Sequence, residues 1–169
     1  VCAFVGGSQP PKSFFENFKT SKNIRFIQIR DYKNDKNIVY IPKKLAKKFA
    51  NKTDVMIGRY GPPVFQILRG IEGAYNVALM KAIPKNNYLD NDYLFYFLKN
   101  NLIQTYIINL SERAAGQSGV NKEALYPYPI FLPNIKNQQK ISVNCKNIET
   151  KIDKIKQNIK NKIELSNKL

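Results

Sequence analysis

The sequence predicts an α+β fold, in which a mixed, twisted sheet carries a packed helix and a long C-terminal coiled-coil helix follows. Two patterns predict it. Short β-prone runs separated by Gly and Pro turns fill the first half of the chain, and apolar residues then recur every three or four positions in two helical stretches. We therefore divide the 169 residues into a domain over residues 1–133 and a helix over residues 134–169.

The expected strands are short and end at turn residues. In chain order, we expect strands at residues 1–5, 24–29, 38–41, 55–58, 64–68 and 75–83. Residues 13–19 could form a short helix or an ordered loop, and residues 43–49 (KKLAKKF) could form a basic helical turn. Residues 89–111 should form one helix, capped by Asp90 or Asn91, that packs its apolar face on the sheet.

The terminal helix has an apolar stripe with heptad spacing. Its a and d positions hold Ile141, Cys145, Ile148, Ile152, Ile155 and Ile159. Lys162 and Ser166 occupy the next two such positions, so the far end of the seam is weaker. A helix over residues 134–169 would be about 54 Å long. The stripe should face either the preceding domain or another chain. Because the helix is longer than a domain of this size is wide, at least part of the stripe should pair with a partner.

The composition favours a polyanionic partner and limits the available chemistry. The net charge is +16, and the terminal helix contributes nine Lys against three acids, so both parts of the chain are basic. Nucleic acid is the favoured partner, ahead of an anionic membrane. The alternative is that an AT-rich genome favours Lys, which then only solvates the surface.

Catalytic and metal signatures are missing from the sequence. Histidine is absent, and Cys2 and Cys145 are too far apart for a metal motif. The chain also lacks the glycine motifs of nucleotide-binding loops and any apolar run long enough to span a membrane. We expect neither catalytic nor metal-binding residues, and a cytoplasmic location.

Candidate DNA contacts lie at strand ends and in loops. Arginine can bond two edge atoms of one base, and three arginines follow expected strands beside polar or aromatic neighbours. The alternative for each is a salt bridge to Asp31 or Glu72. Lysines in loops are candidates for phosphates, with a solvated surface as the alternative. The predicted DNA-binding set is Lys12, Lys19, Lys22, Arg30, Tyr32, Lys33, Arg59, Tyr60, Arg69, Gln117, Ser118 and Asn121, with Lys36 a further candidate for phosphate.

Five segments in order carry a resemblance to a known family. They are Gly6-Gly7-Ser8-Gln9-Pro10, residues 24–32 (IRFIQIRDY), residues 53–61 (TDVMIGRYG), Gly73-Ala74-Tyr75-Asn76, and residues 116–125 followed by 129–141. Together they resemble one target-recognition half of a type I restriction-modification specificity subunit, including its spacer helix. Thr53 stands where that family usually has Gly, and Gln138 stands where it usually has an acid.

The resemblance implies a DNA target-recognition domain that reads one part of a split site. It implies that the helix pairs antiparallel with a counterpart, from a second recognition half or a second copy, and sets the gap between half-sites. Methyltransferase subunits, with an endonuclease subunit as an optional further partner, would bind S-adenosylmethionine, ATP and Mg²⁺, and this chain would hold no cofactor.

Several readings remain open from the sequence. The chain could be a fragment, a dimerising half-subunit, or the C-terminal recognition domain of a fused restriction-methylation enzyme. From another class, it could be a protein-interaction module with a basic face. A stand-alone nuclease using Asp31 and Asp35 is a third hypothesis.

Overall fold

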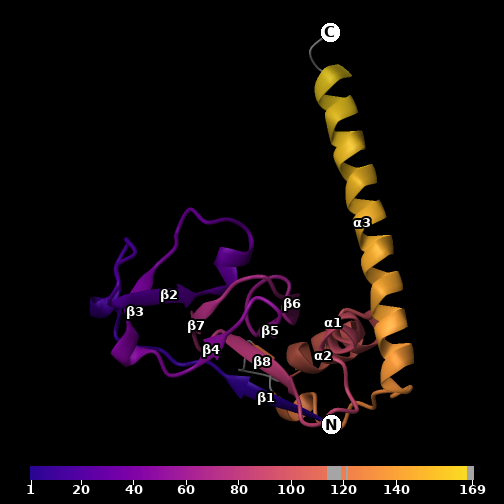
Figure 1. Cartoon of the computed structure of the whole chain (residues 1–169), viewed down its shortest axis with the longest axis horizontal. Coiled ribbons are helices and arrows are strands. Elements are labelled where there is room, and N and C mark those ends of the chain that lie inside the picture. Colours follow the sequence, from indigo (N-terminus) through magenta and orange to yellow (C-terminus); the bar gives the residue numbers. More distant parts are fainter. Residues whose placement is uncertain (114–118, 121, 167–169) are drawn as a thin grey trace.

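The fold is α+β, as predicted, with a long helix at its C-terminal end. The computed structural model describes residues 1–113, 119–120 and 122–166. Within these residues, eight strands form two four-stranded sheets, and helices α1 (Asn91–Leu98), α2 (Asn101–Arg113) and α3 (Ile135–Ser166) follow. The strands lie to one side of α1 and α2, and α3 rises away from the base of the domain (Figure 1).

The first sheet is antiparallel and has the order β1-β8-β5-β6. Its strands are β1 (Cys2–Gly6), β5 (Val55–Gly58), β6 (Gln66–Leu68) and β8 (Leu79–Pro84). Strand β5 is buried along its whole length, as its apolar sequence VMIG predicts. It is central, with Ile57 opposite Ile67 on one side and Met80 on the other.

The second sheet is mixed and has the order β3-β2-β7-β4. Its strands are β2 (Asn23–Ile27), β3 (Tyr40–Pro42), β4 (Phe49–Ala50) and β7 (Gly73–Tyr75). The β2–β7 pair is parallel and the other two pairs are antiparallel. Short 3-10 turns follow or precede these strands at Lys12–Phe14, Ile29–Tyr32 and Lys43–Leu45, and another lies at Lys122–Ala124.

Two predictions of a single element are wrong, because the structure has two shorter elements in each place. The strand expected over residues 75–83 is two strands in different sheets, since the Asn76 side chain accepts a hydrogen bond from Ala78 N at 3.2 Å and turns the chain. The helix expected over residues 89–111 breaks between α1 and α2. There the Asn100 side chain accepts a hydrogen bond from Leu102 N at 2.8 Å, as a helix cap does.

Other predicted boundaries shift by a few residues. The strand expected at 24–29 is β2, and its end becomes the 3-10 turn Ile29–Tyr32. The strand expected at 38–41 becomes β3, and the one at 64–68 shortens to β6. The basic turn expected at 43–49 is the 3-10 turn Lys43–Leu45 followed by β4. The segment at 13–19 overlaps the end of the 3-10 turn Lys12–Phe14. Asp90 caps α1, as predicted, by accepting from Tyr93 N at 2.9 Å.

The largest core lies between the first sheet and helices α1 and α2. Val55 and Ile57 of β5 pack there with Leu94 and Leu98 of α1 and with Ile107 of α2. All five side chains are at most 2% exposed. This burial holds the end of β5 in a fixed position relative to α1, which in turn contacts α3.

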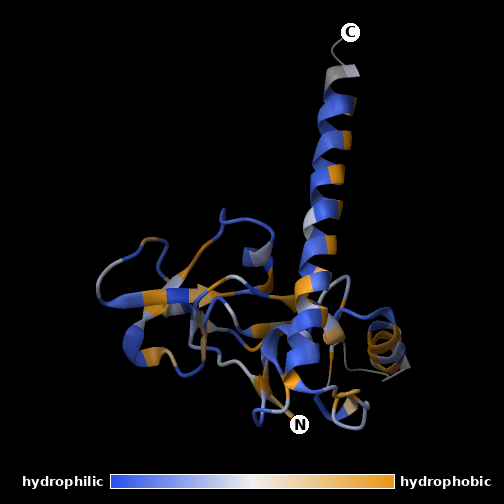
Figure 2. Cartoon of the chain, turned by 45° about the vertical axis from the view of Figure 1, so that its right-hand side comes forward, coloured by the Kyte–Doolittle hydropathy of each residue, from blue (hydrophilic) through white to orange (hydrophobic). Residues whose placement is uncertain are grey.

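Helix α3 contains the predicted stripe and has two environments along its length. Its first turns pack against α1, where Gln138 and Ser142 are buried. From Thr150 to Glu164 every residue is exposed. Hydrophobic bands recur along one side of this helix (Figure 2). The division of the chain at residue 133 stays a prediction, as does the pairing of the stripe.

Candidate nucleic-acid interface

Arg59 lies at the end of β5 and joins three segments. Its Nε donates to Val120 O at 3.1 Å and its Nη1 donates to Val77 O at 3.3 Å. Its backbone N–H donates to Ala78 O at 2.9 Å, and its carbonyl accepts from Val120 N at 2.9 Å. The strand end, the β7–β8 turn and the segment that contains Val120 are therefore held together by this one residue.

Tyr60 extends this arrangement over Gly119. A Cβ at Gly119 would lie 2.4 Å from a ring carbon of Tyr60, so only glycine fits against the ring in this position. The Arg59 guanidinium lies 5.3 Å from the centre of the same ring, within the range of a cation–π contact. Tyr60 remains 40% exposed and offers an aromatic surface to a ligand.

Two further segments meet at this place. The Ile29 side chain lies beside Gly58, and Asn76 N donates to Ile27 O at 3.1 Å. A Cβ at Gly7 would lie 2.0 Å from Asn76 O. We call this surface the Arg59 rim, and define it as residues 7–8, 27–30, 59–60, 76–78 and 119–120. The five segments that carry the family resemblance each contribute to it.

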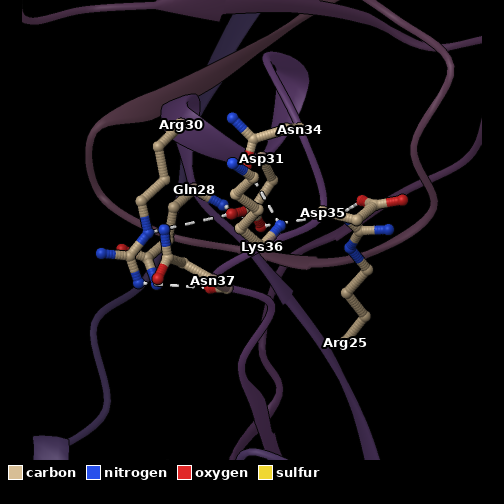
Figure 3. A network of polar contacts seen from close by, with 8 residues as sticks. All are labelled: Arg25, Gln28, Arg30, Asp31, Asn34, Asp35, Lys36 and Asn37. Atoms are coloured by element: carbon tan, nitrogen blue, oxygen red, sulfur yellow. Dashed lines mark hydrogen bonds and ion pairs between the residues drawn. The ribbon is translucent and has the colours of Figure 1, made fainter.

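Arg30 belongs to the rim but is held by a polar network (Figure 3). Its side chain is about half exposed, its Nε lies 3.9 Å from Asp31 Oδ1, and its Nη2 donates to Asn37 O at 3.4 Å. Asp31 is buried and accepts from Gln28 N at 3.1 Å, which closes the 3-10 turn. Burial raises the pKa of Asp31, against the opposing effects of this hydrogen bond and the nearby arginines.

Asp31 and Asp35 of the nuclease hypothesis serve this loop instead. Asp35 Oδ1 pairs with Arg25 Nη2 at 2.8 Å, and the same nitrogen lies 4.0 Å from Asp31 Oδ2. Among the described residues, no group of three or more Cys, Asp or Glu is placed to hold a metal ion. The arrangement fixes the loop that presents Arg30, Lys33 and Lys36.

The structure separates Arg69 and Tyr32 from the exposed part of the rim. Arg69 follows β6 at the opposite end of the β5–β6 hairpin from Arg59, since Leu68 pairs with Met56 and Gln66 with Gly58. Its Nη1 pairs with Asp92 Oδ1 at 2.9 Å, and its guanidinium lies 3.9 Å from the centre of the Phe95 ring. Tyr32 packs against the core around Ile27, and this burial raises the pKa of Tyr32.

Arg59 differs from Arg25, Arg30 and Arg69 in its charge environment. Arg25, Arg30 and Arg69 each lie within 4.0 Å of an aspartate oxygen. In the part of the chain that the structure describes, Arg59 forms no such ion pair, because its partners are backbone carbonyls. Its positive charge is therefore less compensated than that of Arg25, Arg30 or Arg69.

The predicted lysines are exposed, and they do not form one cluster with Arg59. Lys12, Lys19, Lys22 and Lys33 all face solvent. Lys22 precedes β2 and Lys33 follows it, so they lie at opposite ends of that strand. Lys19 lines an open hollow of about 790 Å³ together with Lys43 and Lys52. The sequence reasoning missed Lys43 and Lys52, although the run at 43–48 (KKLAKK) was a signal for Lys43.

Gln117, Ser118 and Asn121 lie outside the described residues. Of the stripe, Ile141, Ile148, Ile152, Ile155 and Ile159 are 40–58% exposed and Cys145 is partly buried. None of the described helices combines the length and apolarity needed to cross a membrane.

Two solved structures share this fold. One is a chain from work on the complex assembly and conformational transition of the type I R-M system, with a TM-score of 0.71 and 20% identity; the match covers 93% of this chain and 38% of that one. The other is the HsdS subunit from Thermoanaerobacter tengcongensis, with a TM-score of 0.68, 19% identity and 93% and 37% coverage. The chain thus spans under two fifths of the solved chains that it resembles.

The family is shown by the sequence match. The model of the type I restriction modification DNA specificity domain matches residues 1–165, which includes both the strand-rich domain and nearly all of α3. This agrees with the resemblance carried by the five segments at the Arg59 rim and at the start of α3. The chain therefore belongs to the type I restriction modification DNA specificity domain family.

Proposed function

We propose that this chain is a sequence-specific DNA-recognition module that reads one half of a bipartite site. The observation that carries the proposal is the family match over residues 1–165. The net charge of +16 supports it, because a protein that neutralises many phosphates gains affinity from counterion release. On this proposal the chain contributes recognition, and catalysis belongs to partner subunits.

The Arg59 rim is the surface proposed to read bases. Arg59 is partly exposed, carries a charge that no described carboxylate compensates, and is fixed by two carbonyls. A fixed guanidinium is suited to bond the O6 and N7 atoms of guanine in the major groove. The exposed Lys19, Lys22 and Lys33 would contact phosphates and set the register.

Helix α3 is proposed to pair with a second recognition half or a second copy of the chain. Its exposed isoleucines lie at the a and d positions of a heptad, which is the pattern of a coiled-coil seam. An antiparallel pair would place two recognition domains at opposite ends. Methyltransferase subunits, and an endonuclease subunit where present, would dock on this assembly and supply S-adenosylmethionine, ATP and Mg²⁺ sites.

Selection from random double-stranded DNA tests the proposal. The chain is assembled with type I methyltransferase subunits, and the bound sequences are recovered at two salt concentrations. A recurring half-site, and affinity that falls steeply with salt, are expected. Loss of all DNA binding in the assembled complex would refute the proposal. Binding without any enriched half-site would instead favour a protein-interaction module.

A further inference from the structure

The first fixed point between the domain and α3 is Gln138. Its side chain is fully buried, and its Oε1 accepts from Asp90 N at 2.8 Å. Its Nε2 donates to Tyr88 O and to Pro133 O, both at 2.7 Å. Both hydrogens of the amide nitrogen are therefore used. Because Asp90 caps α1, this amide joins the first turns of α1 and α3.

The second fixed point is Glu149, three turns further along α3. Tyr96 Oη donates to Glu149 Oε2 at 3.1 Å, and Lys99 Nζ pairs with Glu149 Oε1. Gln138 and Glu149 are about 16 Å apart along the helix axis. Two fixed points separated by this length determine a direction, whereas one would leave a hinge.

Helix α1 is itself fixed to the sheet that ends at the Arg59 rim. Arg69, which follows β6, pairs with Asp92 and lies over the Phe95 ring. Lys99 lies 4.9 Å from the centre of the same ring and reaches Glu149. A continuous set of contacts therefore runs from the β5–β6 hairpin through α1 to α3.

The length of α3 beyond Glu149 turns a small change in the direction of the helix into a large displacement of its far end. The helix has 32 residues, or about 48 Å, and its residues from Thr150 to Glu164 are exposed. A change of about 10° in direction would move its far end by about 8 Å. That exceeds two base-pair steps of about 3.4 Å each.

We infer that Gln138 and Glu149 are positioning residues that fix the direction of α3 relative to the Arg59 rim. Gln138 sets the base of the helix and Glu149 sets its angle against α1. The direction is a property of the chain alone. Its consequence, that these residues restrict the gap allowed between two half-sites, rests on the proposed function.

The direction is tested by distances within the chain. Spin labels are placed at Lys52→Cys and Lys156→Cys in a Cys2→Ser, Cys145→Ser background, and labelled chains are diluted with unlabelled ones. Gln138→Met retains the length of the side chain and removes all three hydrogen bonds. We expect its distance distribution to broaden or shift by about 5 Å, because Lys156 lies about 27 Å along the helix from Gln138 and a change in direction of about 10° moves that point by this amount. Gln139→Met, at an exposed neighbour, should leave it unchanged.

A second variant keeps the test usable if Gln138→Met fails to fold. Glu149→Gln weakens only the second fixed point and should broaden the distribution less than Gln138→Met. Unchanged distances in a folded Gln138→Met variant, with only a lowered melting temperature, would assign Gln138 to stability and overturn the inference. Unchanged distances in Glu149→Gln would overturn the role of Glu149.

The gap is tested with the assembled complex and a series of DNA sites. We expect Gln138→Met to bind sites with a wider range of gaps between unchanged half-sites, while Gln139→Met retains the wild-type range. If a variant has a broadened distribution of spin-label distances but binds sites with the same range of gaps as the wild type, the direction of α3 does not restrict the gap between half-sites, and this part of the inference is overturned. If the wild-type complex binds no DNA, the proposed function fails, and the distances still decide whether the two residues fix α3.

Discussion

Two isoleucines on the exposed part of α3 give a direct measure of helix pairing. Ile152 and Ile159 occupy a positions and are 45% and 52% exposed, so about half of each side chain is available to a partner. We expect the double variant Ile152→Ala, Ile159→Ala to weaken self-association of the chain.

The magnitude follows from the exposed area. Full burial of an isoleucine side chain is worth about 1.5–3 kcal/mol, so covering the exposed half is worth about 1 kcal/mol. A pair of identical chains loses four such side chains, or about 4 kcal/mol. The dissociation constant should therefore rise by roughly 10³-fold.

Sedimentation equilibrium measures this constant, and Val143→Ala is the matched control. Val143 is 57% exposed on the same helix but lies at an f position, outside the seam. Because both helices are strongly basic, association should strengthen as salt screens their repulsion. Equal weakening by Val143→Ala, or a wild-type chain that stays monomeric at high micromolar concentration, would refute the reasoning.

Three other predictions concern the rim and the contact between α1 and α3. Arg59→Ala should relax the preference at one base pair by about 1–3 kcal/mol in a binding-site selection, whereas an equal loss on all sequences would assign Arg59 to phosphate. Gly7→Ala should lower the free energy of unfolding in urea by more than about 2 kcal/mol, because its Cβ would lie 2.0 Å from Asn76 O; Gly6→Ala, with open space around it, should have little effect. The hydrogen bond from Lys99 lowers the pKa of Glu149 in the folded chain. This pair therefore stabilises the fold at a pH above the pKa of Glu149 in the unfolded chain, and the stabilisation is lost as the pH falls through the pKa of Glu149 in the folded chain. Glu149→Gln should remove this part of the pH dependence of the melting temperature, worth less than about 1 kcal/mol for so exposed a pair, and an unchanged profile would contradict it.

The sequence predicted elements well where one local pattern decides the structure. The apolar run of β5 and the periodicity of α3 needed no knowledge of their neighbours, and both elements are present. The two divided elements failed because their breaks depend on single asparagine side chains. Asn76 and Asn100 bond to the backbone two residues later, and an asparagine within an apolar run does not show whether it will do so.

The sequence could indicate which residues of the candidate site to choose, but not which of them lie together in the fold. Arg59 and Tyr60 were chosen from their positions at a strand end, and the structure brings Gly119 against Tyr60. Arg69 was chosen on the same grounds, but its guanidinium forms an ion pair with Asp92 of α1, 23 residues later in the chain. A contact between distant residues leaves no local pattern, so the sequence could not separate the two arginines.

The sequence of α3 contains a second, mostly polar periodic pattern that indicates the role of Gln138, beside the heptad pattern of isoleucines. Gln138, Ser142, Cys145 and Glu149 recur at steps of four, three and four, which defines a second stripe on α3. This stripe is mostly polar, so a search for apolar periodicity passes over it. A polar residue within a helical stripe therefore deserves the same test for burial as an isoleucine.

The two stripes of α3 share Cys145 but are centred on different sides of the helix, so one helix can contact both α1 and a partner. At 100° per residue, the stripe from Gln138 to Glu149 is centred about 80° from the isoleucine stripe. Helix α1 covers the first stripe and leaves the isoleucines 40–58% exposed. A partner helix can therefore pair along the isoleucines without displacing α1. In an antiparallel pair, the far end of the partner helix would lie beside the base of α3. The direction that Gln138 and Glu149 give to α3 would then also be the direction of the pair.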